Sequence, residues 1–240
     1  MPNFKFFKPM KIIITGASRG IGKAIAEKFN EMGNTLLLCS RNINLLELAA
    51  GELRQKNAAT IKIFSADLSQ PAEVLKFAEF CLQDGAPDLL INNAGLFISG
   101  KVYNEADGQL ERMLNINLFS AYHLTRAVLP GMIKNRSGHI FNICSVASLQ
   151  PYHEGGSYSI SKYALKGFSE NLRQELKGKG IKVTAVYPGA VMTESWSGFD
   201  NSQNRIMEAS DISEMIYSSS KLSSQAVVED IVIRPQLGDL

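Results

Sequence analysis

Several kinds of residue and segment are scarce in this 240-residue chain, and each scarcity excludes a class of protein. There are only 3 cysteines, Cys39, Cys81 and Cys144, which lie far apart and form no C-x-x-C pair. Their odd number and wide spacing argue against a disulfide framework and against a zinc site, and favour a reducing compartment. The 3 histidines share no ligand spacing, so we expect no metal.

Long apolar runs are also missing, so no stretch could span a bilayer or form the core of a signal peptide. Residues 1–10 contain three phenylalanines, but lysines and a proline interrupt them, and we expect a short N-terminal extension there. The net charge of +2 is too small to favour nucleic acid or an anionic membrane as a partner. We therefore expect a cytoplasmic protein that acts on a small molecule.

The sequence does contain a regular alternation of short apolar runs and longer amphipathic stretches. These predict strands at 11–15, 35–40, 61–65, 89–92, 139–144, 182–187 and 230–234. Between them they predict helices at 20–32, 44–57, 71–84, 109–134, 159–177 and 210–221. Nearly all-apolar strands separated by helices indicate a parallel sheet that is covered on both faces. The predicted fold is a single α/β domain over residues 11–240, a Rossmann fold with a doubly wound, seven-stranded parallel sheet.

One segment differs in composition from the rest of this domain. Residues 195–224 are rich in Ser, Asn, Asp and Met. This polarity predicts a mobile loop followed by a marginal helix. We interpret the region at about 190–222 as a substrate lid, and not as a second domain.

The run KIIITGASRGIGK at 11–23 predicts a strand, a glycine-containing turn and the start of a helix. Gly16, Gly20 and Gly22 would let the backbone approach a pyrophosphate closely. The free N–H groups and the positive dipole end of the following helix would attract that anion. The spacing is G-x-x-x-G-x-G and not the usual G-x-G-x-x-G, so a tight turn without a ligand is the alternative.

The end of the second predicted strand indicates which dinucleotide would bind. NAD sites place an acid there for the ribose 2′-hydroxyl. Here the strand ends at Ser40-Arg41, and no acid follows before Glu47. A guanidinium can hold a 2′-phosphate through charge-assisted hydrogen bonds, and Arg19 in the glycine turn can approach the same group. We therefore predict that NADP(H) is preferred over NAD(H).

Tyr158 and Lys162 are four residues apart at the start of a predicted helix, which places them on one face. A unit charge about 4 Å from a phenol is worth roughly 4 kcal/mol at an effective dielectric near 20. This corresponds to about three pKa units. We expect Lys162 to lower the pKa of Tyr158 against opposing desolvation, and to make Tyr158 a proton donor. A Y-x-x-x-K pair alone is also common on ordinary helices.

Polar residues follow two predicted strands at their carboxyl ends, which face the ligand crevice in a doubly wound sheet. Ser145 closes the fifth strand, where its hydroxyl could orient a carbonyl, and a turn residue is the alternative. Residues 92–95 read Asn-Asn-Ala-Gly at the end of the fourth strand. Asn117 lies in the long predicted helix 109–134, where a helix-surface amide is the alternative.

Taken together, these residues resemble the short-chain dehydrogenase/reductase family over about residues 11–234. Residues 15–22 resemble its TGxxxGxG cofactor turn, and residues 92–95 resemble its NNAG motif. Asp67-Leu68 matches its acidic position beside the adenine ring, and Pro188-Gly189 followed by Thr193 matches the segment that closes over the nicotinamide. The residues that match its catalytic tetrad are Asn117, Ser145, Tyr158 and Lys162.

The resemblance implies an NAD(P)-dependent oxidoreductase in which Tyr158 protonates the carbonyl oxygen and Ser145 holds it. Lys162 would bind the nicotinamide ribose, and Asn117 would hold a water of a proton relay. A homodimer or homotetramer through the helices at 109–134 and 159–177 is also implied. The implied cofactor-binding residues are Gly16, Ser18, Arg19, Gly20, Ile21, Gly22, Arg41, Asp67, Leu68, Asn93, Ala94, Gly95, Tyr158, Lys162, Pro188, Gly189, Val191 and Thr193.

The substrate is expected to be a small ketone or aldehyde, or the corresponding alcohol. Its pocket should suit an apolar or flat ring, and its predicted walls are Leu96, Phe97, Leu149, Tyr152, Met192 and Trp196. The runs PGAVMTESW and VVEDIVIRPQLGDL resemble bacterial sepiapterin reductases, which would imply a pterin side-chain diketone. A 3-oxoacyl-acyl-carrier-protein reductase is the enzymatic alternative. An NADP(H)-sensing binding protein is the non-enzymatic one, although such proteins usually lose the Tyr/Lys pair.

Overall fold

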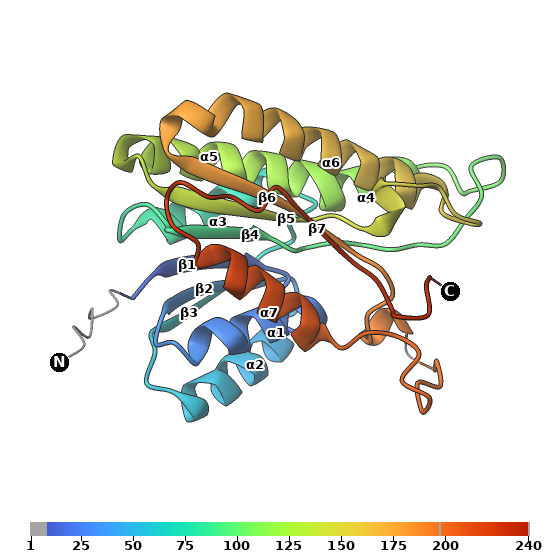
Figure 1. Cartoon of the computed structure of the whole chain (residues 1–240), viewed down its shortest axis with the longest axis horizontal. Coiled ribbons are helices and arrows are strands. Elements are labelled where there is room, and N and C mark those ends of the chain that lie inside the picture. Colours follow the sequence, from blue (N-terminus) through green and yellow to red (C-terminus); the bar gives the residue numbers. More distant parts are fainter. Residues whose placement is uncertain (1–8, 197, 240) are drawn as a thin grey trace.

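The computed structural model describes residues 9–196 and 198–239, so the predicted extension at 1–10 lies almost entirely outside the described residues. One sheet of seven strands runs through the centre of the molecule, and all of its strand pairs are parallel (Figure 1). The strand order is β3-β2-β1-β4-β5-β6-β7. The strands are β1 (Lys11–Thr15), β2 (Thr35–Ser40), β3 (Ile61–Ser65), β4 (Leu89–Asn92), β5 (Gly138–Ile143), β6 (Ile181–Pro188) and β7 (Asp230–Ile233).

Helices cover both faces of this sheet because side chains of each strand point alternately to either face. In β1, Ile12 and Ile14 pack on one face and Ile13 on the other, and all three are fully buried. The first face carries α1 (Gly20–Asn30), α2 (Ile43–Lys56) and α7 (Ala209–Ser220). The second face carries α3 (Pro71–Leu82), α5 (Ser120–Asn135) and α6 (Gly156–Leu176) (Figure 1). The predicted single-domain, doubly wound α/β Rossmann fold is thus confirmed.

The predicted helix over 109–134 is wrong as a single α-helix. The structure has α4 (Gln109–Leu114), then a π-helical turn, η1 (Asn115–Phe119), and then α5. A π turn inserts an extra residue into the helical ladder, and such insertions often occur at functional sites. Here the wider turn carries Asn117, whose side chain is only 1% exposed. Periodicity did not predict the turn because its apolar residues still follow a helical pattern.

Two other helices also differ from the prediction. α6 begins at Gly156, three residues before the predicted start, so Tyr158 lies in its first turn. A glycine pair followed by serine is typical of a loop, and no capping residue precedes Gly156 to indicate a helix start. The expectation of a marginal helix near 210–221 is also wrong. Ile212 and Ile216 of α7 are fully buried in the core beneath α1, and the Tyr217 ring packs edge-on against Phe29 at 5.5 Å.

The site is positioned by the reversal of strand order between β1 and β4. Ligands of doubly wound sheets bind beyond the carboxyl ends of the strands at such a point. Hydrogen bonds connect the two strand ends directly, since the Thr15 hydroxyl accepts from the backbone N–H groups of Asn93 and Ala94, both at 2.9 Å. The Asn93 side-chain amide donates in turn to the Thr15 carbonyl at 2.9 Å. The glycine turn is therefore fixed against the segment that follows β4.

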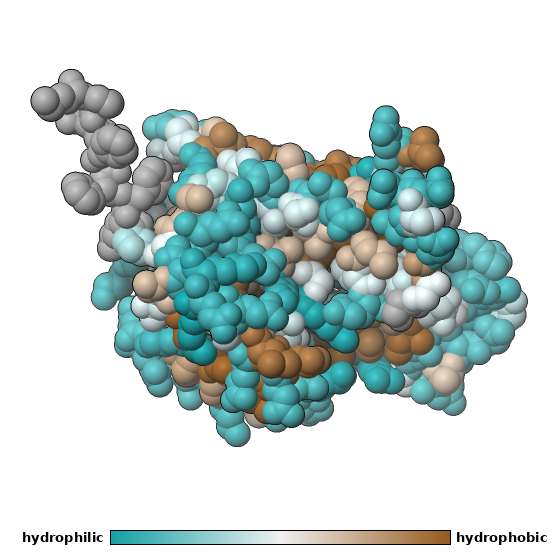
Figure 2. Space-filling view, turned by 90° about the horizontal axis from the view of Figure 1, so that it is seen from below, coloured by the Kyte–Doolittle hydropathy of each residue, from teal (hydrophilic) through white to brown (hydrophobic). Residues whose placement is uncertain are grey.

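The outer surface near the first helix layer is mainly hydrophilic. Seen from the side of α1, α2 and α7, polar residues dominate and hydrophobic ones form separate patches (Figure 2). Within residues 9–196 and 198–239, no helix is long and apolar enough to cross a membrane.

Two helical glycines provide a test of the packing at the glycine turn. A Cβ on Gly22 would lie 2.2 Å from the Gly16 carbonyl oxygen, whereas one on Gly51 would meet nothing within 4 Å. Gly22→Ala is expected to lower the free energy of unfolding by about 1–3 kcal/mol through overpacking. Gly51→Ala should instead raise it by about 0.5–1 kcal/mol, because alanine is the better helix former. Urea unfolding of the two variants measures this opposition, and changes of the same sign would contradict the packing.

Candidate active site

The four residues of the expected tetrad come from three parts of the chain and lie at the carboxyl end of the sheet. Ser145 follows β5 by two residues, Tyr158 and Lys162 lie in α6, and Asn117 lies in η1. Ser145 is held in place as the N-cap of a short 3-10 turn, η2 (Val146–Ser148), where its hydroxyl accepts from the Ala147 N–H at 3.1 Å. The fold therefore brings a hydroxyl, a phenol and an amine together.

Tyr158 is partly buried, and its ring packs edge-on against Phe97 with 4.9 Å between the ring centroids. Burial raises the pKa of the Tyr158 phenol above its ordinary value, while a hydrogen bond with the Ser145 side chain opposes this in part. The expected net lowering of this pKa is not found in this structure, because desolvation of the phenolate is the largest effect. The raised pKa keeps the phenol protonated at neutral pH, as a proton donor requires.

Lys162 is only 4% exposed, and its amine lies 5.8 Å from the centroid of the Tyr158 ring. The amine donates a hydrogen bond of 2.8 Å to the Ile143 carbonyl at the end of β5. Burial lowers the pKa of Lys162 to about 8. The amine is therefore held in the crevice close to its point of titration, and its charge is sensitive to any group that binds beside it.

Asn117 is not a helix-surface amide, which was the alternative for this residue. Its Oδ1 accepts from the Leu96 N–H at 2.7 Å, and its Nδ2 donates to the Leu96 carbonyl at 3.0 Å. The same Nδ2 donates to the Ser161 hydroxyl of α6 at 2.8 Å. Asn117 therefore ties the loop after β4 to the helix that carries Tyr158 and Lys162. A Cβ on Gly95 would lie 3.4 Å from Asn117 Oδ1 and 3.6 Å from Lys162 Nζ, so the glycine leaves space beside both groups.

The glycine turn after β1 fits the phosphates of a dinucleotide. Gly16 has a positive φ of 66°, and a Cβ there would lie 3.0 Å from Asn93 Nδ2. Among the described side chains, none caps the N-terminus of α1, and the first turn of this helix contains no acid. Its N–H groups are thus available to an anion. Thr193 lies over the turn, because a Cβ on Gly20 would be 3.1 Å from Thr193 Cγ2.

The two arginines expected to bind the 2′-phosphate are both exposed, and Arg19 lies in the glycine turn. Arg41 is exposed directly after β2. Arg19 Nε lies 3.9 Å from Glu194 Oε2, and both side chains are more than half exposed. The sequence did not predict this ion pair, because its partners are far apart in the chain. A 3.0 Å hydrogen bond between the hydroxyls of Ser40 and Ser18 connects the end of β2 to the glycine turn.

The other predicted cofactor residues lie around the carboxyl ends of the strands. Asp67 and Leu68 follow β3, and the Asp67 carboxylate accepts from the Ser69 N–H at 3.0 Å. Pro188 ends β6, and the Gly189 N–H donates to the Ile233 carbonyl at 2.8 Å. Val191 is buried and forms an isolated parallel bridge with Met207. Ile21 lies in the first turn of α1 and packs against the core of the first face.

The six predicted pocket residues are not equally close to Tyr158. Phe97 contacts its ring directly, and Leu96 is tied to Asn117 as described above. Trp196 instead packs edge-on against Phe199 at 5.3 Å, and Leu149 packs on the small core cluster around Tyr187. The Met192 N–H is bonded to the Met207 carbonyl at 2.7 Å.

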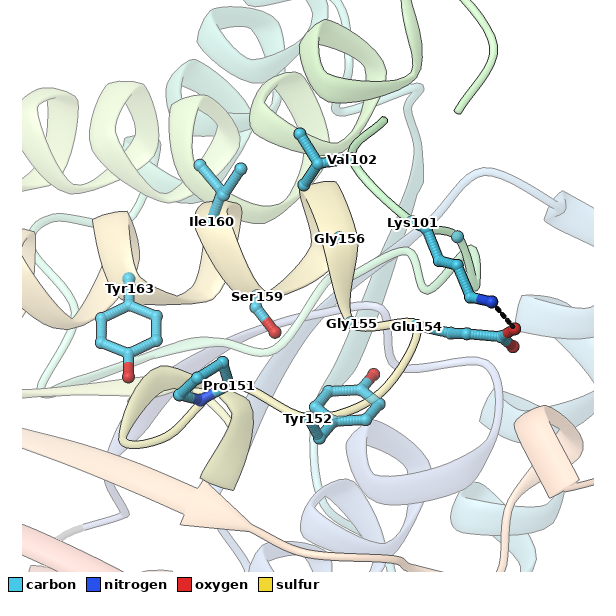
Figure 3. A pocket seen from close by; sticks show the side chains of 11 residues that line it. Lys101, Val102, Pro151, Tyr152, Glu154, Gly155, Gly156, Ser159, Ile160 and Tyr163 are labelled. Atoms are coloured by element: carbon cyan, nitrogen blue, oxygen red, sulfur yellow. Dashed lines mark ion pairs between the residues drawn. The ribbon is translucent and has the colours of Figure 1, made fainter. Parts of the chain in front are cut away.

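Tyr152 borders a different hollow, of about 500 Å³, on the outer face of α6 (Figure 3). Ser159, Ile160 and Tyr163 line that hollow, and Tyr158 does not. The structure thus places Tyr152 at this hollow.

Cys144 lies next to this site but belongs to the core. Cys144 precedes Ser145, but it is 3% exposed and packs in a cluster with Leu165 and Tyr187. Burial raises the pKa of its thiol to about 11, so it is protonated at neutral pH. In the part of the chain that the structure describes, no group of three or more His, Cys, Asp or Glu residues could hold a metal ion.

Sequence reasoning missed one residue next to this site. The carboxylate of Glu105, in the loop after β4, accepts from the N–H of Ser157 at 2.8 Å and from its hydroxyl. Ser157 directly precedes Tyr158. No local pattern indicated this contact, because 52 positions separate the two residues and the contact exists only in the folded chain.

Known proteins with similar sequences and structures agree with this geometry. The family model for short chain dehydrogenases matches residues 10–204. An uncharacterized oxidoreductase of Staphylococcus epidermidis is 31% identical over 224 residues, which cover 93% of this chain and 96% of the relative. The sepiapterin reductase of Chlorobaculum tepidum is 33% identical over 238 residues, covering 95% and 97% of the two chains.

A solved structure of a metagenomic short-chain oxidoreductase in complex with NADP is also similar. It superimposes with a TM-score of 0.83 at 29% identity, covering 94% of this chain and 97% of that one. The family match extends over most of the chain and includes the glycine turn, the strand ends and the residues around Tyr158. The chain belongs to the short-chain dehydrogenase family and is an oxidoreductase that acts on CH–OH or C=O groups.

Proposed function

We propose that this oxidoreductase reduces a small ketone or aldehyde with NADPH, using Tyr158 as the proton donor. One observation carries the proposal, namely that the Tyr158 phenol lies against the Ser145 hydroxyl and beside the buried amine of Lys162. A general acid must be protonated and within reach of the oxygen it protonates. The reverse oxidation would use the same groups.

The residues would act in the following way. When bound, the cofactor supplies the hydride. Ser145 holds the substrate oxygen at the end of β5, and the Tyr158 hydroxyl delivers its proton to that oxygen. Lys162 binds the nicotinamide ribose and stabilises the phenolate that is left behind. Asn117 holds the loop after β4 against α6 and would position a water that connects Lys162 to solvent.

The preference for NADPH is supported by charge at the end of β2. Arg41 and Arg19 offer two guanidinium groups for a 2′-phosphate, and no acid occupies the position that would bind a 2′-hydroxyl. The similar metagenomic oxidoreductase was solved with NADP. Thr193, in the lid predicted at about 190–222, lies over the glycine turn and would cover the bound cofactor.

The exposed aromatic ring of Phe97 beside Tyr158 favours a flat or apolar substrate. Phe97 is 44% exposed, so part of its side chain is accessible to the ring of a substrate. The sepiapterin reductase relative, at 33% identity, supports a pterin with a side-chain diketone as the first candidate. A 3-oxoacyl thioester is the second candidate substrate.

The assembly would be a homodimer, or a tetramer built from it, through α5 and α6. The outer faces of η1, α5 and α6 expose Phe119, Tyr122, Ile160 and Tyr163, each between 37% and 43%. These helices lie side by side with no other described element over them (Figure 1). Adjacent exposed apolar side chains mark contact surfaces. Three buried free thiols also favour a reducing, cytoplasmic location.

Replacing Tyr158 by phenylalanine tests the reductase proposal. NADPH oxidation would be measured with diacetyl, an aryl diketone, sepiapterin, cyclohexanone and an acetoacetyl thioester. The best of these substrates should lose roughly 10²- to 10⁴-fold in kcat, because the general acid is removed. Tyr163→Phe is the control, since it lies on the outer face of the same helix and is 41% exposed. Equal rates for wild type and Tyr158→Phe would refute the assignment. No oxidation with any carbonyl would favour an NADP(H)-sensing protein.

Arg41→Ala tests the cofactor preference. Loss of one charge-assisted contact with the 2′-phosphate should weaken NADPH binding roughly 10- to 100-fold. NADH binding should stay nearly unchanged, which provides an internal control. Fluorescence titration measures both affinities. Unchanged affinity for both cofactors would show that Arg41 does not contact the 2′-phosphate.

Two apolar residues with matched exposure test the proposed assembly. Ile160 on α6 is 43% exposed and Met215 on α7 is 42% exposed. Ile160→Glu should dissociate the dimer because it places a charge in the contact, whereas Met215→Glu should leave it intact. Analytical ultracentrifugation distinguishes the species, and a monomeric wild type would overturn the proposal.

A further inference from the structure

The helix that carries Tyr158 begins without a cap of its own. The N-cap residue Gly155 has no side chain, and the first turn of α6 contains no acid. The first N–H groups of a helix have no partner within the helix, so they need acceptors from elsewhere. At this end the acceptor decides how firmly the first turn is held, and Tyr158 is part of that turn.

Glu105 supplies the acceptor from the loop after β4. Its Oε1 accepts from the Ser157 N–H at 2.8 Å, and its other oxygen accepts from the Ser157 hydroxyl. Ser157 is only 3% exposed, and its contact with the half-buried Glu105 is partly buried. A carboxylate at a helix N-terminus is also favoured by the helix dipole. One side chain thus binds the main chain and the side chain of the residue directly before Tyr158.

Two glycines leave the room that this carboxylate occupies. A Cβ on Gly156 would lie 1.8 Å from Glu105 Oε1, and one on Gly100 would lie 2.8 Å from Glu105 Cγ. Gly156 also has a φ of 33°, which disfavours other residues. No side chain at either position could be accommodated without displacing Glu105. The space that the Glu105 carboxylate occupies therefore depends on glycine at both positions.

The same loop reaches Tyr158 from a second direction. Phe97 packs against the Tyr158 ring, and the Gly100 N–H donates to the Glu154 carbonyl at 3.0 Å. Lys101 and Glu154 form an ion pair of 3.7 Å beside Gly155 and Gly156 (Figure 3). The loop after β4 and the first turn of α6 are thus joined at several points. Phe97 contacts the Tyr158 ring, and Glu105 holds the main chain directly before it.

We propose that Glu105 is a positioning residue that fixes the Tyr158 hydroxyl against Ser145 by anchoring the first turn of α6. This inference rests on the proposed role of Tyr158 as proton donor. Proton transfer depends on placement, and a shift of about 1 Å in a reacting group can cost roughly 100-fold in rate. Glu105 contacts neither the phenol nor Lys162 in this structure, so its effect passes through Ser157.

The experiment compares Glu105→Ala with Glu105→Gln, using the best carbonyl of the panel above. Alanine removes both hydrogen bonds, and kcat should fall roughly 10- to 100-fold while the affinity for NADPH changes less than about threefold. Glutamine keeps an acceptor for the Ser157 N–H and offers an amide donor to its hydroxyl, so kcat should return to within about threefold of wild type. Asp107→Ala is the control, because Asp107 is exposed in the same loop and makes no side-chain hydrogen bond among the described residues.

A measurement without turnover accompanies the kinetics. Amide hydrogen exchange in the first turn of α6 should be faster in Glu105→Ala and unchanged in Glu105→Gln and Asp107→Ala. Glu105→Ala with Ser157→Ala should cost less in kcat than the two single changes added together, because both remove the hydrogen bond of the Ser157 hydroxyl. A thermal midpoint that falls without any loss of kcat would overturn the proposal, as would a failure of glutamine to restore kcat. If Tyr158→Phe kept full activity, the proton-donor assignment would fail, while the exchange result would still report the anchor.

Discussion

The site depends on holding the amine of Lys162 inside the protein next to the phenol of Tyr158. Burial of both groups costs free energy in their charged forms, and this cost appears as a pKa of about 8 for Lys162 and a raised pKa for Tyr158. A lysine pKa lowered from 10.5 to about 8 corresponds to about 3 kcal/mol of lost preference for the charged form. The fold must supply this stability elsewhere, and the large core on both faces of the sheet does so. What the protein gains is an amine whose protonation state responds to neighbouring charge.

The arrangement around this pair is made by long-range contacts, and each joins parts of the chain that are distant in sequence. Thr15 and Asn93 hold the glycine turn against the end of β4. Asn117 connects the next loop to α6 through Leu96 and Ser161, and the Ile143 carbonyl fixes the Lys162 amine. These bonds use side-chain amides and backbone carbonyls, which keep their hydrogen-bonding capacity at any ordinary pH. The proposed proton transfer would then involve only Tyr158 and Lys162, and a general acid needs this separation of roles.

The sequence predicted the strands well, and it identified the Tyr158–Lys162 pair, because their patterns are local. A strand such as Ile12–Ile14 is recognisable from its own apolar run, and the Tyr158–Lys162 spacing follows from helix geometry. The errors came where the outcome depends on tertiary contacts. The π turn at Asn115–Phe119 keeps a helical pattern of apolar residues, and the early start of α6 needs a carboxylate from another loop as its acceptor. The pKa of Tyr158 was misjudged because charge attraction is simple to evaluate from spacing, whereas desolvation depends on the folded surroundings.

The raised pKa of Tyr158 also determines which protonation state of the phenol is present before a substrate binds. A group that must donate a proton has to hold it before the substrate arrives, and a phenol with a raised pKa holds it throughout the neutral range. An enzyme that starts from the alcohol would need the phenolate first, and burial opposes that form. Lys162, with its pKa near 8, is mostly charged at neutral pH and is placed to stabilise the phenolate only after the proton has left. In the proposed mechanism, the reverse oxidation therefore requires that added positive charge or higher pH offset the cost of burying the phenolate.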